Sequence, residues 1–362
     1  MTATPAEVVT EVVGDRASLW DRQRELPRKV LRKLAAGSLL CPQVPAAYGG
    51  LGMTSAQAGE FTAHVGGLCG SLRSVLTSQG MVAWAIHRLG TQEQRDTYLP
   101  KLASGTLAGV AFSERHAGSD LSAMATEIRT DGAELVVRGE KTWVTGAAYA
   151  DLLMVFGRGG VVLIPGSMVG VRIEPVPQPL GCRAAGHATV RLDDVRLPRT
   201  SRLGTGRRPL GMQITSALTY GRLSVAWGCV GILRACLAAA VSHARTRHQF
   251  GRALAEHQLV ARHLAELLVA EQAATRVCEH ASSCWDQARP QVVSAVVVAK
   301  HLAATNAMRG AASAVQVLAS AGAHDDHVVA RAFRDAKLME IIEGSSEISQ
   351  LLLAEHAITE WS

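Results

Sequence analysis

The sequence lacks several features that would place it in a common structural class. No run of five or more basic residues occurs, no two cysteines are spaced as C-x-x-C, and no long apolar stretch is free of charge. Its 37 Lys and Arg residues stand against 31 Asp and Glu residues, a formal net charge of +6. With 48% hydrophobic residues, the composition is that of a globular protein with a large core, which excludes disorder and low complexity.

The basic residues are scattered, and their densest group predicts a solvated helix face. This group is Arg28, Lys29, Arg32 and Lys33, which lie among apolar residues at helical spacing. We therefore expect no nucleic-acid partner and no membrane surface, whereas an acidic partner or an anionic substrate stays open.

Nothing in the sequence predicts a membrane anchor, an exported protein or a disulfide framework. The apolar stretch 224–240 contains Arg234, which favours a buried core helix over a membrane span. The N-terminus contains the acidic residues Glu7, Glu11 and Asp15, and it lacks the positively charged start and apolar run of a signal peptide. We therefore predict no signal peptide and expect a cytoplasmic protein. The seven cysteines lie mostly among apolar or small neighbours, which predicts buried reduced thiols.

Several frequent catalytic signatures are missing as well. No G-x-G-x-x-G follows a predicted strand, and G-x-x-x-x-G-K-[ST], H-E-x-x-H and G-x-S-x-G do not occur. The sequence therefore gives no support for a common nucleotide-binding motif, a zinc protease or a serine hydrolase. His324, Asp325, Asp326 and His327 form the most metal-like group, but consecutive polar residues are more typical of an exposed loop, and we predict no metal site.

The apolar pattern divides the chain into three parts and predicts an α+β fold. Residues 1–105 are predicted as a helical N-terminal domain, and residues 106–208 as a middle β domain with short strand-like runs between Gly and Pro. Residues 209–362 are predicted as a C-terminal helical bundle, because long Ala- and Leu-rich helices follow one another. The four helices expected there cover about 211–246, 255–285, 291–320 and 345–358.

Four segments contain more polar and aromatic side chains than packing requires. They are 111–120 (AFSERHAGSD), 140–146 (EKTWVTG), 247–251 (RHQFG) and 334–348, which ends in IIEGSSEI. The first can present backbone N–H groups to an anion or a ring, and the second offers a large aromatic plane beside a hydroxyl. Taken singly, each segment also fits an ordinary turn, core residue, helix end or helix start.

In order and spacing these segments resemble the acyl-CoA dehydrogenase family, and the resemblance covers nearly the whole chain. It implies a helical N-terminal domain, a middle β domain and a C-terminal four-helix bundle, with FAD bound between them and across a subunit boundary. It also implies an acyl thioester substrate on CoA or an acyl carrier protein, a separate electron acceptor, and a homodimer or homotetramer.

The resemblance implies roles for individual residues. Glu343 matches the catalytic base, which removes the α-proton of an acyl thioester while hydride leaves the β-carbon for flavin N5. A carboxylate buried beside an apolar ligand has a raised pKa and is a better base. The implied substrate-binding residues are Ser119 and Arg222. The implied FAD-binding residues are Phe112, Ser113, Gly118, Ser119, Trp143, Val144, Thr145, Arg247, Phe250, Gln316, Ser345 and Glu347.

Some of these roles concern particular parts of the cofactor. Trp143 is implied to cover one face of the flavin ring, and Thr145 to hydrogen-bond near N5. Arg247, Phe250 and Gln316 are implied to reach the FAD of a neighbouring subunit.

The sequence also departs from the family pattern. Ala319 and Ser320 stand where a Gly-Gly pair is usual, and Arg115-His116 replaces the usual residues after Glu114. Some relatives carry the base just before Arg222, but this chain has Gly221 there, so Glu343 stands alone as the candidate.

The overall sequence further resembles the branch of the family that serves polyketide extender-unit pathways. In that branch a short hydroxylated three-carbon unit on an acyl carrier protein is oxidised towards hydroxymalonyl and methoxymalonyl units, and the positive charge suits an acidic carrier protein. Three alternatives stay open: a fatty or branched acyl-CoA dehydrogenase, a flavin oxidase or hydroxylase of the same fold, and a binding protein that has lost the chemistry.

Overall fold

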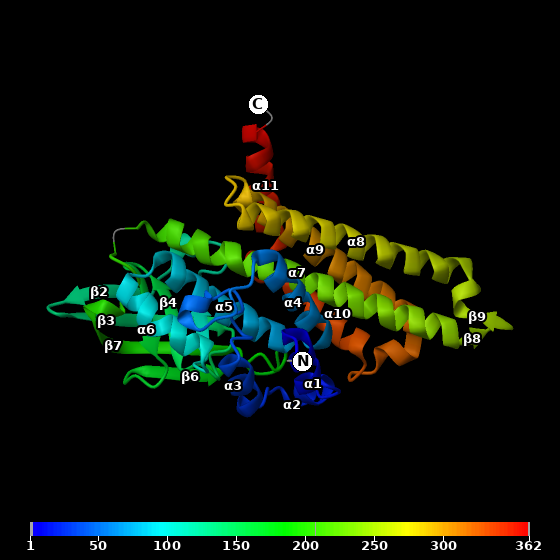
Figure 1. The fold of residues 1–362 in the computed structure, drawn as a ribbon, viewed down its shortest axis with the longest axis horizontal. Helices are drawn as coiled ribbons and strands as arrows, with labels where there is room; N and C mark the ends of the chain where they lie inside the picture. Colours follow the sequence, from blue (N-terminus) through cyan, green and yellow to red (C-terminus); the bar gives the residue numbers. More distant parts are fainter. Residues whose placement is uncertain (1–2, 207, 361–362) are drawn as a thin grey trace.

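A computed structural model describes residues 3–206 and 208–360, and Figure 1 shows a β part at one end of a long array of helices. The helices that precede the first strand are α1 (Pro5–Val13), α2 (Ala17–Gln23), α3 (Arg28–Ala36), α4 (Ser55–Leu68), α5 (Gly70–Leu89) and α6 (Gln92–Ala103). A threonine before α1, α4 and α6 accepts a hydrogen bond from the backbone N–H three residues later, which fixes each helix start. Nearly every residue of α5 is buried, so this helix is the centre of the N-terminal part.

The β part consists of two sheets that share a core. In one sheet the strand order is β1 (Ala108–Ala111), β4 (Leu152–Gly157) and β5 (Gly160–Pro165). In the other it is β2 (Glu127–Asp131), β3 (Glu134–Val144), β7 (Ala188–Pro198) and β6 (Val171–Pro175). Side chains of both sheets form one apolar cluster, and the other side chains of β4 pack into a cluster with α5 and α6. All residues of β4 are therefore buried, which explains its continuous apolar run.

Long helices form the C-terminal part. They are α7 (Leu210–Thr246), α8 (Gln258–Asp286), α9 (Val292–Leu318), α10 (Val328–Met339) and α11 (Ser346–Glu360). The hairpin of β8 (His248–Gln249) and β9 (Arg252–Ala253) links α7 to α8. Helices α7 to α10 pack together, whereas α11 contacts α9 and then projects away from the array (Figure 1). By length and composition α7 alone passes as a membrane span within the described chain, but 67% of its apolar window is buried in the core.

Glycines on α7 allow the close packing that this central helix needs. A Cβ atom built on Gly231 would lie 1.9 Å from the carbonyl oxygen of Ala63 on α4. No real side chain tolerates such a distance, so the two backbones meet only because residue 231 is glycine. The stretch 224–240 is thus a core helix, as its sequence predicts.

The order of helical, β and helical parts agrees with the predicted fold class, and the seven cysteines are buried free thiols, as expected. One helix, α10, is absent from the prediction. Its N-cap residue is His327, whose Nδ1 accepts a hydrogen bond from the backbone N–H of Val329 at 3.2 Å. The preceding Asp325 and Asp326 form ion pairs with arginines, so the group 324–327 is a docked loop before a helix.

The basic group is exposed on α3, as predicted, and two of its arginines also contact the β part. Arg32 pairs with both carboxylate oxygens of Asp151, at 2.5 and 2.6 Å. Arg28 donates to the carbonyl oxygen of Ala148 at 2.5 Å. These two arginines therefore connect the N-terminal helices to the β part.

Candidate active site

The site is a cavity of about 730 Å³ where the three parts of the chain meet. Helix α5, the ends of β1 and β3, helix α7 and the segment after α10 supply its walls. A volume of this order is typical of sites for small molecules and cofactors. The predicted residues that line it are Phe112, Ser113, Gly118, Ser119, Trp143, Val144, Thr145, Arg222, Glu343 and Ser345.

Glu343 lies in the turn between α10 and α11. Its φ of +55° is in the left-handed region, which residues with a side chain rarely adopt. Two buried cations hold this turn: Arg222 Nε donates to the carbonyl oxygen of Glu343 at 2.9 Å, and Lys300 Nζ donates to that of Gly344 at 2.5 Å. These hydrogen bonds from other helices stabilise a backbone conformation that is unfavourable by itself.

Burial and a missing hydrogen-bond partner define the surroundings of the Glu343 carboxyl group. Its buried Oε2 atom has no hydrogen-bond partner in the described part of the chain. Burial raises the pKa of Glu343, and this effect outweighs the opposing charges of Arg222, Lys300 and Arg73. Because Arg222 and Lys300 donate to carbonyl oxygens, the carboxylate keeps lone pairs available for a proton.

Gly221 adjoins this carboxyl group. A Cβ atom on Gly221 would lie 2.7 Å from Glu343 Oε2 and 2.8 Å from Met81 Sδ. Position 221 therefore faces the same space as the Glu343 carboxyl group. The glycine leaves that space to the Glu343 carboxyl group.

The end of β3 contributes an aromatic face and polar atoms. Trp143 has a φ of +55° and is 51% exposed. Thr145 Oγ1 lies 3.2 Å from His187 Nδ1, and the Trp143 and His187 rings are 5.6 Å apart. Burial, with a smaller contribution from Arg73, lowers the pKa of His187 to about 4, so this ring is neutral near pH 7. Its Nε2 has no partner among the described residues and is available to a ligand.

A buried ion pair fastens the loop after β1 to β3. Lys141 Nζ donates to Glu114 Oε1 at 2.7 Å and to the carbonyl oxygen of Phe112 at 2.9 Å. Burial raises the pKa of Glu114, but hydrogen bonds from Lys141, Thr126 and the backbone outweigh it and hold this pKa at about 2. The base of the loop is therefore fixed next to the exposed Arg115.

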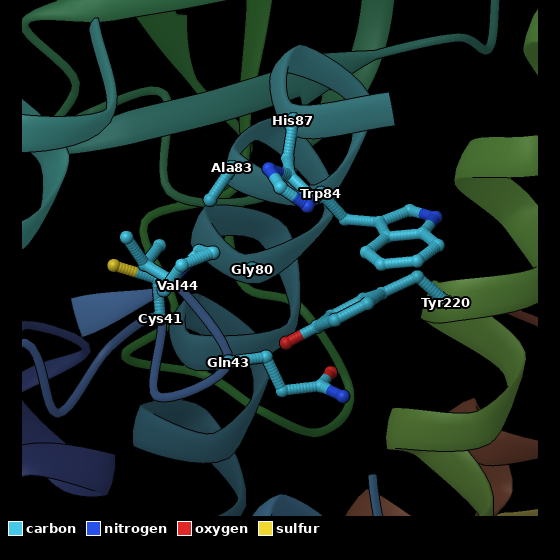
Figure 2. A pocket seen from close by; sticks show the side chains of 9 residues that line it. Cys41, Gln43, Val44, Gly80, Ala83, Trp84, His87 and Tyr220 are labelled. Atoms are coloured by element: carbon cyan, nitrogen blue, oxygen red, sulfur yellow. The ribbon is translucent and has the colours of Figure 1, made fainter. Parts of the chain in front are cut away.

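A much smaller pocket shows where Tyr220, the neighbour of Gly221, points. Its volume of about 10 Å³ holds no more than about one water molecule. Figure 2 shows the Tyr220 hydroxyl pointing across this pocket toward Gly80. A Cβ on Gly80 would lie 2.2 Å from that oxygen, so the glycine makes room for it. Tyr220 thus packs on α5 and does not line the large cavity.

Four predicted cofactor residues do not line the cavity of their own chain. Arg247 caps the end of α7, and Phe250 lies in the turn of the β8–β9 hairpin, which Figure 1 shows at the far end of the array from the sheets. Phe250 is 95% exposed, and Gln316 is exposed near the end of α9. Glu347 is exposed in the first turn of α11, where it hydrogen-bonds with Ser345.

Sequence reasoning missed several residues that line or support the cavity. Arg73, Thr77 and Ser78 line it from α5, His187 lines it from the start of β7, and Lys300 supports it from α9. Arg73 and Lys300 carried a usable signal, because each places a charge within an apolar helix. His187 carried none, since an isolated histidine is usually an ordinary packed residue.

Comparison with known families defines the class of protein. The N-terminal, middle and C-terminal domains of acyl-CoA dehydrogenase match residues 1–106, 109–195 and 211–358. The chain belongs to the acyl-CoA dehydrogenase family, whose members are FAD-dependent oxidoreductases.

Several individual relatives are similar to this chain over nearly its whole length. A solved structure of FkbI, for biosynthesis of the methoxymalonyl extender unit of the polyketide Fk520, is 58% identical, with a TM-score of 0.94 and coverage of 98% of this chain and 99% of that chain. Probable acyl-CoA dehydrogenase YngJ of Bacillus subtilis (strain 168) is 32% identical over 96% of this chain and 94% of the relative. Glutaryl-CoA dehydrogenase of Desulfococcus multivorans is 28% identical over 93% of this chain and 90% of the relative.

Proposed function

We propose that this chain is an FAD-dependent acyl-thioester dehydrogenase with Glu343 as its general base. The observation that carries the proposal is the Glu343 carboxyl group, which lines the cavity with an unpartnered buried oxygen and a raised pKa. The backbone N–H of Glu343 makes no hydrogen bond to a backbone acceptor in the described chain. A base and a free N–H donor in one residue suit the removal of a weakly acidic α-proton next to a thioester carbonyl.

The residues around the cavity fit a flavin. Trp143 offers a half-exposed aromatic face, Thr145 a hydroxyl, and His187 an unpartnered buried ring nitrogen. When bound, FAD supplies the acceptor for the hydride from the β-carbon. The residues that we propose to hold it within one chain are Phe112, Ser113, Gly118, Ser119, Trp143, Val144, Thr145 and Ser345, with Glu347 near its ADP part.

The chain itself supplies the proton chemistry. Glu343 Oε2 takes the α-proton, and the backbone N–H of Glu343 donates to the thioester oxygen as negative charge develops there. Proton transfer converts a buried carboxylate into a neutral acid, which burial favours. Arg222 and Lys300 keep the turn in place during this step, because both donate to its carbonyl oxygens. Arg222 and Ser119 also line the space that the substrate enters.

We propose a short hydroxylated acyl group on an acyl carrier protein as the substrate, as in polyketide extender-unit biosynthesis towards hydroxymalonyl and methoxymalonyl units. The support is the 58% identity with FkbI over 98% of the chain. The net charge of +6 favours an acidic carrier protein over a neutral partner.

The assembly proposed is a homodimer or homotetramer that passes its electrons to a separate acceptor. Phe250 is 95% exposed, and on the projecting helix α11 Leu351 and Ile358 are 66% and 73% exposed. Large apolar side chains of this kind are typical of surfaces that another chain covers. Free thiols at all seven cysteines support a cytoplasmic location.

The first experiment is the visible absorption spectrum of the purified protein, repeated without oxygen after thioesters are added. We expect an oxidised-flavin spectrum that bleaches with a carrier-bound hydroxylated three-carbon substrate. The same acyl group on CoA is the matched comparison, and peroxide is measured when air is readmitted.

Each result bears on one part of the proposal. Equal or faster bleaching by CoA esters would remove the carrier-protein preference. Peroxide formed as fast as the substrate is consumed would make the enzyme an oxidase. A colourless protein that takes up no added FAD would remove the dehydrogenase assignment and leave a binding protein of the same fold.

A further inference from the structure

Several arginines near the start of α7 form no ion pair within the described part of the chain. Five of them are exposed or half-buried and are called here the arginine surface: Arg88, Arg158, Arg199, Arg202 and Arg208. Elsewhere in the β part, the exposed Arg172, Arg191 and Arg196 each pair with a carboxylate. The arginine surface is therefore a local excess of positive charge.

Hydrogen bonds bring three segments of the chain together at this surface. Arg202, in the loop between β7 and α7, donates to the carbonyl oxygen of Gly159, in the turn between β4 and β5. In the same loop, Arg208 donates to the carbonyl oxygen of Arg88 near the end of α5, at 3.2 Å. The end of α5, the turn and the loop therefore form one continuous surface.

The positive charges on this surface are not balanced by carboxylates of the described chain. Burial, together with the nearby charge of Arg199, lowers the pKa of Arg202. A Cβ atom on Gly160 would lie 3.0 Å from Arg202 Nη1, so this glycine leaves room for the guanidinium group. The backbone of Glu127 bridges to that of Arg158, but the two side chains form no ion pair. Like charges gathered in this way favour an anionic partner from outside the chain.

The turn between β4 and β5 lies next to the active-site cavity. Arg158 donates to the carbonyl oxygen of Ala125 at 3.3 Å. The backbone N–H of Ala125 donates to Glu114 Oε2 at 2.6 Å, and Glu114 lines the cavity. Two hydrogen bonds thus connect the arginine surface to the cavity wall.

Helix α7 makes a second connection between this surface and the cavity. Leu210, at the start of the helix, lines a hollow of about 280 Å³ together with Arg202 and Arg208. Leu218, about two turns further along, lines the active-site cavity. Eight residues of helix span about 12 Å, a distance that the extended pantetheine arm of a carrier protein covers.

The hollow combines charged side chains with an apolar floor. Val161 and Leu203 are buried beneath it, and Leu210 is half-buried at its side. A folded partner with acidic side chains around an apolar contact complements this arrangement, whereas a free phosphate would make no use of the floor. Figure 1 shows the start of α7 at the β part, at the opposite end of the helix from the β8–β9 hairpin. The surface is therefore separate from the hairpin that we propose to contact another subunit.

We infer that the arginine surface is the docking site of an acidic acyl carrier protein, whose pantetheine arm enters the cavity past Leu121 and Leu218. The inference rests on the proposed function, because it needs an acyl thioester to reach Glu343 in that cavity. Charges around an interface accelerate association with an oppositely charged partner and set its orientation. The arginines thus select the carrier protein, while the cavity selects the acyl group.

The test compares one acyl group on three carriers. A hydroxylated three-carbon acyl group is attached to a purified acidic acyl carrier protein, to CoA and to free pantetheine. Flavin reduction without oxygen gives a second-order rate constant for each thioester. Binding of the carrier protein with a free pantetheine thiol is measured separately, by calorimetry at low and at high salt.

Reversing two exposed charges should affect the carrier protein selectively. In the double variant Arg158→Glu and Arg208→Glu, we expect the carrier protein to bind about ten- to a hundred-fold more weakly at low salt. Its rate constant should fall in proportion, and the loss should shrink at high salt because the charges are then screened. The thioesters of CoA and free pantetheine should change little.

A matched control makes the same change in net charge elsewhere. Lys29→Glu with Lys33→Glu alters two exposed side chains on α3, which Figure 1 shows away from the start of α7. This variant should leave all three rate constants unchanged. Arg158→Gln with Arg208→Gln guards against a folding defect, because it adds no negative charge beside Glu127, and it should give a smaller loss of the same kind.

Three results would overturn the inference. These are no binding of the carrier protein to the unchanged enzyme, an equal loss in the α3 control, and an equal loss for the CoA thioester. The last result would assign the arginines to a phosphate group. If no thioester reduces the flavin, the proposed dehydrogenase function fails, while the calorimetry still decides whether the arginine surface binds the carrier protein.

Discussion

At the scale of the residue, Glu343 joins a strained backbone to a buried carboxyl group. Its left-handed φ aims the side chain into the cavity, while hydrogen bonds to the carbonyl oxygens of residues 343 and 344 keep the turn in place. The positive charges lie close enough to lower its pKa, yet burial prevails. The result is a carboxyl group with a raised pKa, which makes it a stronger base than an exposed glutamate.

Replacing Glu343 by Gln should remove the base. It should also show how much the burial of a charged carboxylate lowers the stability of the folded protein. We expect turnover to fall by about 10²- to 10⁴-fold with FAD still bound. Folding raises the pKa of Glu343 above its ordinary value of 4.5. Protonation of this carboxyl group therefore stabilises the folded protein fully below pH 4.5. This stabilisation is lost as the pH rises through the pKa of the folded state. The stability of Glu343→Gln relative to the unchanged protein should therefore increase from acidic to neutral pH.

Urea unfolding of both apoproteins across that pH range checks the sign. The control is Glu347→Gln, an exposed carboxylate four residues away, which lacks the burial. A stability difference that stays constant with pH would show that the Glu343 carboxyl group titrates normally.

At the scale of the element, the end of α9 carries a strain that its sequence does not reveal. Ala319 caps this helix with φ +51° and ψ −129°, a conformation suited to glycine. The backbone therefore keeps a conformation that favours glycine, at the position where the family resemblance implies a Gly-Gly pair and this chain has Ala319 and Ser320. The departure is accommodated by strain in the alanine.

Ala319→Gly should stabilise the protein by about 1 kcal/mol, because relief of the strain exceeds the added freedom of the unfolded chain. Ser320→Gly is the matched control, since Ser320 is not among the residues with positive φ. It should destabilise by about 0.5–1 kcal/mol. Denaturant unfolding of the two variants should thus give changes of opposite sign, and two changes of the same sign would refute the account.

At the scale of the whole molecule, we propose that sites are shared between chains. Arg247 and Phe250 lie at the end of the array remote from the sheets, where they do not line their own chain's cavity. Under the proposed function they serve the FAD of a neighbouring copy, together with Gln316. Each complete site then combines Glu343 of one chain with Arg247 of another.

Complementation should detect this sharing. Arg247→Ala and Glu343→Gln should each be inactive when FAD is limiting, but co-expressed chains should regain activity that neither has alone. A mixed oligomer contains one site with both residues intact and one with neither. Each variant co-expressed with itself is the control, and light scattering establishes the oligomer. Absence of rescue in a mixed oligomer would show that both residues act within one chain.

Local patterns were enough to predict much of this protein. Helical and alternating apolar periodicities predicted the order of its three parts, because these periods depend on which residues face the core. Glu343 as the candidate base, and Trp143 and Thr145 as candidate cofactor residues, were predicted from a family resemblance. Helix α10 was missed because its start is a polar loop whose aspartates pair with distant arginines.

The tertiary structure decided what depends on contacts between distant segments. The sequence alone determined the family, the helical and β parts, and the candidate base. Only the fold shows that the arginine surface lies beside the cavity, that His187 has a free nitrogen, and that Lys300 supports the turn. The physical reason is that burial, pairing and the pKa of a charged group depend on neighbours that the fold brings from elsewhere in the chain.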